Sequence, residues 1–191
     1  MTELSDFYFN EEKVLFDGKE CPSILCDFDA KFPSQVDRYF TRFYYRKSDT
    51  VNEDHQILIH SNRICLVGLA PSHIAFVKGI KSVDFNIGNI DRRKNHCSGK
   101  GKKGAMNLQS TSALAIVTCK DDTQYKVVSC ITGKLTEVNE RLMDNPQLLA
   151  QEGDGYVAIC LPKIDKVDDI KQTLISEEEY RKMSSDLGSN N

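Results

Sequence analysis

Short apolar runs recur between residues 55 and 162, and turn-forming residues separate them. Residues 80–87 alternate, with Val83, Phe85 and Ile87 on one apolar face, as in a half-buried strand. By the same reasoning the pattern predicts strands at 55–60, 63–70, 80–87, 113–119, 124–131, 134–138 and 155–162. Many short strands with turns at close spacing are typical of a β-sandwich or barrel.

Residues 34–47 carry a helical pattern instead. Val36, Tyr39, Phe40 and Phe43 recur at the spacing of one helix face, and Ser34 precedes them as a candidate N-cap. The pattern therefore predicts a short amphipathic helix. Two interpretations stay open: the aromatic face packs on the β domain, or it binds a partner.

The remaining segments divide the chain into three regions. Residues 1–34 contain eight acidic residues against three lysines and sustain no period, which predicts a partly disordered tail. Residues 35–165 form the predicted β domain. Residues 166–191 are predicted to be a tail with a short helix at 176–183, because Ser176 and Glu179 have the spacing of a capping box.

Composition narrows the class of protein without naming a function. The chain has 191 residues, 40% of them hydrophobic, and a formal net charge of −3. Its longest apolar runs are much shorter than the roughly 20 residues of a membrane-spanning helix, so no membrane segment is expected. The acidic N-terminus does not resemble a secretory signal. We therefore expect a cytosolic or nuclear protein.

The seven cysteines are scattered and odd in number, which argues against a disulfide framework. Most lie in apolar runs, where a thiol behaves as a small buried hydrophobe. Cys21 and Cys26 form a C-x4-C pair without a second pair at zinc-site spacing, so no metal or other cofactor is expected. A dyad of Cys65 with His60 or His73 stays open, but no nucleophile motif accompanies it, and we expect a non-enzymatic protein.

Charge is concentrated in residues 91–104, DRRKNHCSGKGKKG, which hold six basic residues and one acidic residue. A basic cluster in an acidic chain attracts acidic partners. It is also compatible with a merely solvated loop. The candidate contact residues are Arg92, Arg93, Lys94, Lys100, Lys102 and Lys103.

The C-terminal half resembles the glycine-cleavage H protein, a lipoyl carrier. Matching residues in their order are Gly133, Val138, Asn139, Glu140, Asp144, Asn145, Pro146, Leu148, Gly155 and Tyr156. The resemblance implies a mainly β, H-protein/lipoyl-like β-sandwich half-barrel, the barrel-sandwich hybrid, with short flanking helices. It also implies that the lipoyl-lysine position falls on Asp122. Lys120 is the nearest lysine, so lipoylation is not expected, and a cryptic carrier role through Lys120 stays an alternative.

Longer stretches resemble the Abitram family, also called Simiate. They are VDRYFTRFY (36–44), EDHQILIHSNRICLVGLAPSH (53–73), SGKGKKGA (98–105), YKVVSCITGKLTEVNE (125–140) and GYVAICLPK (155–163). The resemblance implies actin binding, a role linked to transcription, and a location in both nucleus and cytoplasm. The basic cluster is then the expected contact for acidic actin. A nucleic-acid or transcription-complex adaptor is the alternative.

Overall fold

The protein is described by a computed structural model, which places residues 14–21, 33–47 and 52–188. Two compact units divide the chain, residues 1–34 and residues 35–191. The first contains an antiparallel hairpin of β1 (Val14–Phe16) and β2 (Lys19–Cys21). Residues 1–13 and 22–32 of the predicted N-terminal tail, including Cys26, lie outside the described residues.

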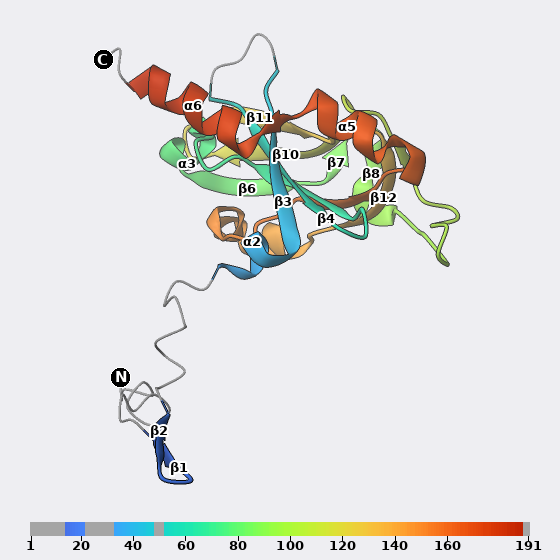
Figure 1. The fold of residues 1–191 in the computed structure, drawn as a ribbon. Coiled ribbons are helices and arrows are strands. Elements are labelled where there is room, and N and C mark those ends of the chain that lie inside the picture. Colours follow the sequence, from blue (N-terminus) through green and yellow to red (C-terminus); the bar gives the residue numbers. More distant parts are fainter. Residues whose placement is uncertain (1–13, 22–32, 48–51, 189–191) are drawn as a thin grey trace. The chain divides into compact units, whose positions relative to one another are not determined.

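The larger unit contains a seven-stranded sheet in which neighbouring strands run antiparallel (Figure 1). Its order is β14 (Ile175–Ser176), β3 (Phe40–Tyr45), β4 (His55–His60), β5 (Cys65–Leu69), β13 (Ala158–Leu161), β12 (Gly133–Val138) and β9 (Asn107–Leu108). Strands from both ends of the larger unit, β3 and β14, are therefore neighbours in one sheet.

A three-stranded antiparallel sheet supplies the second layer, in the order β11 (Gln124–Val128), β10 (Ala113–Cys119) and β6 (Ile80–Asp84). Strands β7 (Asn86–Ile87) and β8 (Ile90–Asp91) form a small separate hairpin. Ile57 and Val67 from the large sheet share one buried cluster with Val83 and Val117 from the small one. The removal of these apolar faces from water holds the two sheets together. The predicted mainly β, sandwich-like architecture is confirmed.

Short helices connect and cover the strands. They are α2 (Gln35–Tyr39), α3 (Ile74–Lys78), η2 (Arg92–Lys94), α4 (Arg141–Asp144), η3 (Pro146–Ala150), η4 (Ile164–Lys166), α5 (Val167–Thr173) and α6 (Glu177–Gly188). Within the described part of the chain, no helix is long and apolar enough to cross a membrane.

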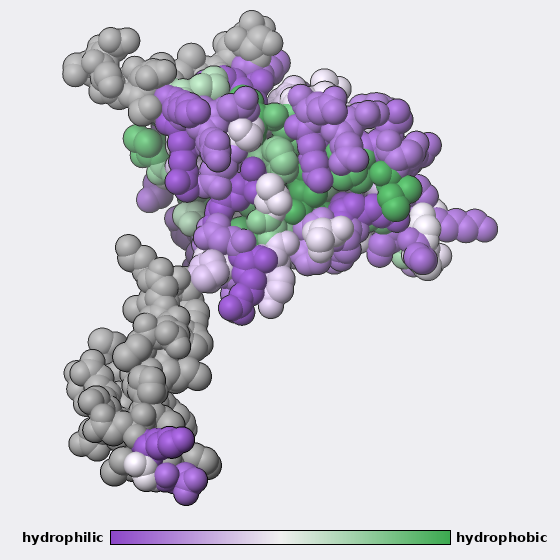
Figure 2. All heavy atoms as spheres, viewed as in Figure 1, coloured by the Kyte–Doolittle hydropathy of each residue, from purple (hydrophilic) through white to green (hydrophobic). Residues whose placement is uncertain are grey.

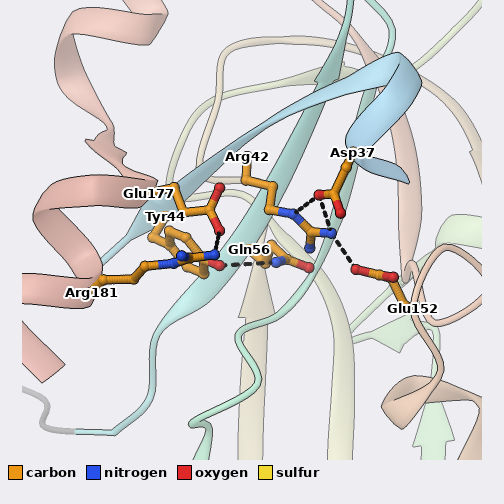
Figure 3. Close-up of polar contacts among 7 residues, drawn as sticks. All are labelled: Asp37, Arg42, Tyr44, Gln56, Glu152, Glu177 and Arg181. Atoms are coloured by element: carbon orange, nitrogen blue, oxygen red, sulfur yellow. Dashed lines mark hydrogen bonds and ion pairs between the residues drawn. The ribbon is translucent and has the colours of Figure 1, made fainter. Parts of the chain in front are cut away.

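The helix predicted over 34–47 is wrong beyond Tyr39, where α2 ends and β3 begins. The run from Phe40 is rich in aromatic residues, which also suit a strand, and pairing with β4 and β14 decides between the two. Arg42, on β3, donates hydrogen bonds to Asp37 on α2 and to Glu152 in a distant loop (Figure 3). The short helix is thereby fixed against the sheet.

The C-terminal helix forms with the predicted cap, because the Ser176 hydroxyl and amide both donate to Glu179. Its Tyr180 ring stacks on Tyr44 of β3, with ring centroids 3.8 Å apart. The Tyr180 hydroxyl donates to Asp54 Oδ2 over 2.9 Å, and Arg46 pairs with the same carboxylate over 2.6 Å. Asp54 is 1% exposed, so these bonds satisfy a buried charge.

Candidate functional site

The basic cluster is split by the structure into a buried and an exposed part. Arg92 is only 8% exposed, and its Nε donates to the Ala113 carbonyl over 2.9 Å. Burial also lowers the pKa of its guanidinium. Arg92 is therefore part of the packing beneath the loop, and its guanidinium is not presented at the surface as the predicted contact requires.

Arg93 is largely neutralised by its neighbour. Its Nε and Nη2 donate to the two oxygens of Asp91 over 2.9 and 2.8 Å, and its backbone amide donates to Asp91 as the cap of η2. The hydrogen bonds from Arg93 lower the pKa of Asp91. The ion pair with Asp91 partly compensates the charge of Arg93, so Arg93 attracts an acidic partner less strongly. Counting charges along the sequence does not reveal this pairing.

The other four predicted residues lie at the surface of one loop. We call residues 94–104 the basic loop. Lys94, Lys100 and Lys103 are exposed, and Lys102 is half-buried. In the described ranges none of the four forms an ion pair. Their charge is therefore available to solvent or to a partner.

The basic loop is held in one shape by its own turn and by β12. Ser98 and Lys103 exchange backbone hydrogen bonds of 3.0 and 2.9 Å, which close the loop tip. Gly104 has a φ of +85°, and a Cβ there would lie 3.0 Å from the His96 carbonyl oxygen, so the turn requires glycine. Asn95 Nδ2 donates to the Leu135 carbonyl over 2.9 Å. The loop base is thus tied to the sheet.

Lys134 on β12 is a cation of this region that sequence reasoning missed. Its Nζ donates to the carbonyls of Gly101 and Lys102 over 2.9 and 3.0 Å. It thereby adds positive charge beside the loop while fixing the loop backbone. Its position inside a predicted strand gave no signal, because only the fold brings that strand under the loop.

The β10–β11 hairpin contains the position that the H-protein resemblance assigns to lipoyl-lysine. Asp122 occupies it with a φ of +60° and accepts from Lys81 Nζ over 2.7 Å. Asp121 beside it pairs with Lys78 over 3.1 Å. Hydrogen bonds from Thr123, followed by one from Lys78, lower the pKa of Asp121 to about 2. The tip therefore carries two acidic side chains, each paired with a lysine, where a carrier needs a free lysine.

Lys120 is exposed at the start of the same turn. A Cβ at Gly79 would lie 3.1 Å from Lys120 Cδ, so the alkyl chain of the lysine lies against that glycine. Its backbone amide donates to the Gly79 carbonyl over 2.9 Å. The residue is fixed at its base beside α3 and does not stand at the centre of the turn.

The buried thiols and imidazoles have structural partners. Burial raises the pKa of Cys65 to about 12, and its Sγ lies 3.5 Å from the Arg63 carbonyl oxygen. A thiol that resists ionisation is a poor nucleophile, which speaks against a catalytic dyad of Cys65 with His60 or His73.

The buried imidazoles accept backbone hydrogen bonds. His73 Nδ1 accepts from the Ala75 amide and caps α3, while His55 Nε2 accepts from the Val128 amide. In the placed part of the chain, no cluster of three or more His, Cys, Asp or Glu is arranged to hold a metal.

A groove of about 1070 Å³ lies beside the basic loop, within residues 35–191. Lys100 and Gly101 of the loop line one part of it, and Asp169 and Ile170 of α5 line another. Sequence reasoning missed this groove because its walls come from segments far apart in the chain.

Comparison with known proteins decides the family. Residues 102–187 match the family model described as glycine cleavage H-protein. A Drosophila melanogaster protein named Protein Abitram is 51% identical over 179 residues, covering 93% of this chain and 82% of the relative. The chain belongs to the Abitram family. The human Protein Abitram is 42% identical over 159 residues, covering 79% of this chain and 87% of the relative.

The structural comparison agrees with the fold. A glycine cleavage system H protein from Mycobacterium marinum superposes with a TM-score of 0.51, covering 75% of this chain and 96% of that one. Sequence identity is 15%, so this likeness concerns the fold alone. This chain thus combines an H-protein-like fold with a β10–β11 hairpin that has Asp122 in its turn.

Proposed function

We propose that the protein is a non-catalytic binding protein that binds actin and modulates its assembly, with the basic loop as the electrostatic contact. The observation that carries the proposal is the set of four loop lysines, Lys94, Lys100, Lys102 and Lys103, which lack ion pairs in the described ranges. A fixed basic surface speeds encounter with an acidic partner and orients it. Membership of the Abitram family supports actin as that partner, together with a nuclear and cytoplasmic location.

The chemistry of the domain supports binding over carriage or catalysis. The carrier position holds Asp122, paired with Lys81, and Cys65 is buried with a raised pKa. Neither side chain offers a nucleophile or an acyl-accepting amine. The H-protein-like domain then acts as a rigid support for the loop.

Co-sedimentation with filamentous actin at two salt concentrations tests this proposal. The test variant is Lys100→Glu, Lys102→Glu and Lys103→Glu, and the charge-matched control is Arg38→Glu, Lys126→Glu and Lys171→Glu, all at exposed positions. Wild type and control are expected to pellet with actin, more strongly at low salt, and the loop variant is not. Equal pelleting of all three proteins removes the loop from the contact.

A nucleic-acid adaptor is the second candidate, favoured by the same unpaired lysines. It predicts binding of RNA or DNA whose affinity falls steeply with salt, because each phosphate contact releases counterions. The basic loop contains no Phe, Tyr or Trp for base stacking, so duplex or backbone binding is the form expected. Fluorescence anisotropy with a labelled duplex and a labelled single strand at low salt tests it, and no affinity for either would exclude it.

A further inference from the structure

The groove beside the basic loop has an apolar interior. Its lining residues include Leu108 of β9, Ile131, Leu161, Pro162 and Ile170 of α5. Leu161 is half-buried and the other four are buried. Figure 2 shows apolar side chains across the middle of the face in view, with hydrophilic side chains around them. A ligand here gains from the burial of large apolar groups.

The edge of the groove carries an excess of positive charge. Lys100 and Lys163 are exposed lining residues, and neither forms an ion pair in the placed part of the chain. Arg63 and Lys134 also line the groove, and they donate only to backbone carbonyls, so both keep their full charge. Of the two acidic lining residues, Asp165 and Asp169, the second is paired with Lys166 over 2.9 Å.

These cations come from different elements. Lys100 belongs to the basic loop and Lys134 to β12, while Arg63 precedes β5 and Lys163 follows β13. A fatty acid has a single carboxylate at one end of its acyl chain and would therefore pair with only one of these four cations. A peptide that repeats acidic residues between apolar ones matches both the distributed charge and the apolar lining.

Polar groups along the groove suit a peptide backbone. Asn107, Gln109 and Thr132 are exposed lining residues with amide or hydroxyl groups. Asn107 belongs to β9, the edge strand of the large sheet. Edge strands and exposed amides are the usual partners of extended peptides.

We propose that this groove binds an extended acidic segment of a partner protein, anchored by large apolar side chains. The inference rests on the proposed binding function and specifies the part of the partner that is recognised. The basic loop then forms one wall of the site through Lys100 and Gly101.

Selection of a random dodecapeptide library on the immobilised full chain tests the inference. The enriched peptides are expected to combine Asp or Glu with Leu, Ile or Phe. Substitution of their apolar residues by Ser should weaken binding about tenfold, the loss of one buried anchor. No enrichment, or enrichment of neutral or basic peptides, would overturn the proposal.

Variants locate the site. Lys100→Glu with Lys163→Glu should weaken the binding of an enriched peptide about tenfold or more, while Lys126→Glu, at an exposed position of β11, leaves its affinity unchanged. Peptide-induced amide shifts in an NMR spectrum should fall on groove residues such as Gln109 and Thr132. Unchanged affinity in the double variant, or the same shifts produced by oleate without any peptide effect, would refute a peptide site.

The inference and the proposed function fail in different ways. If Lys163→Glu alone leaves actin pelleting intact while the loop variant abolishes it, and no peptide is enriched, the groove is excluded and the function stands. If neither wild type nor any variant pellets with actin but acidic peptides are enriched, the groove stands with another acidic partner. This second outcome refutes actin binding but leaves the groove proposal standing.

Discussion

Two buried histidines are predicted to make the fold sensitive to mild acid. His55 is 7% exposed and His73 is 2% exposed. Burial lowers the pKa of each imidazole to about 4. The nearby His73 lowers the pKa of His55 further, while the Asp54 carboxylate acts in the opposite direction on both. In the unfolded chain both groups titrate near 6.5.

The direction of the effect follows from where the protons bind. Between pH 6.5 and pH 4 the unfolded chain binds protons on these imidazoles and the folded chain does not, so acid favours unfolding. The stabilising contribution is fully present above pH 6.5 and is lost as the pH falls toward 4. From pH 7 to pH 5 the loss is about 2 kcal/mol for each histidine and about 4 kcal/mol for both. That is a large part of the roughly 5–15 kcal/mol that stabilises a typical domain.

Urea unfolding at half-unit steps from pH 7 to pH 5 measures this slope. In the wild type the Val128 amide donates to His55 Nε2 and the Ala75 amide donates to His73 Nδ1. The double variant His55→Gln with His73→Asn keeps an amide oxygen near each of these positions to accept the same hydrogen bonds. It should flatten the slope, whereas His96→Gln at an exposed position should not. Two results would contradict the role of these histidines. One is a free energy of unfolding that stays constant from pH 7 to pH 5, and the other is a double variant with the same slope as the wild type.

Three further predictions concern single residues. Tyr180→Phe removes the hydroxyl that donates to buried Asp54 and should lower the free energy of unfolding by about 1–3 kcal/mol in urea; no change would mean that water replaces the bond. Arg92→Met leaves the Ala113 carbonyl without its side-chain donor and should cost about 1–3 kcal/mol, while actin pelleting of the folded protein is retained; lost pelleting would return Arg92 to the contact. Intact mass of protein isolated from its own cells should show no lipoyl adduct, because the H-protein resemblance assigns the carrier position to Asp122, which is not a lysine; an added lipoyl mass would contradict this.

The strand pattern could be predicted because it depends on local alternation and turns. Residues 55–60 and 113–119 form strands with the predicted bounds, and the H-protein resemblance gave the layer architecture. The run from Phe40 to Tyr45 was misassigned since its aromatic spacing fits a helix face, and only pairing with β4 reveals the strand.

The candidate site was less predictable because its geometry depends on contacts distant in sequence. A count of charges found the loop lysines, but it could not show that Ala113 accepts from Arg92 or that Lys134 lies under the loop. Likewise, the acidic character of Asp122 was readable, whereas its pairing with Lys81 was not. Such contacts join strands that pair only in the folded domain.

Acetylation footprinting of the unmodified chain, alone and with filamentous actin, shows which lysines actin covers. Lysine reactivity is read by mass spectrometry, with Lys126 and Lys171 as internal controls. Actin is expected to protect Lys94, Lys100, Lys102 and Lys103 while the two controls react as before. Actin-bound protein whose loop lysines stay fully reactive would contradict it.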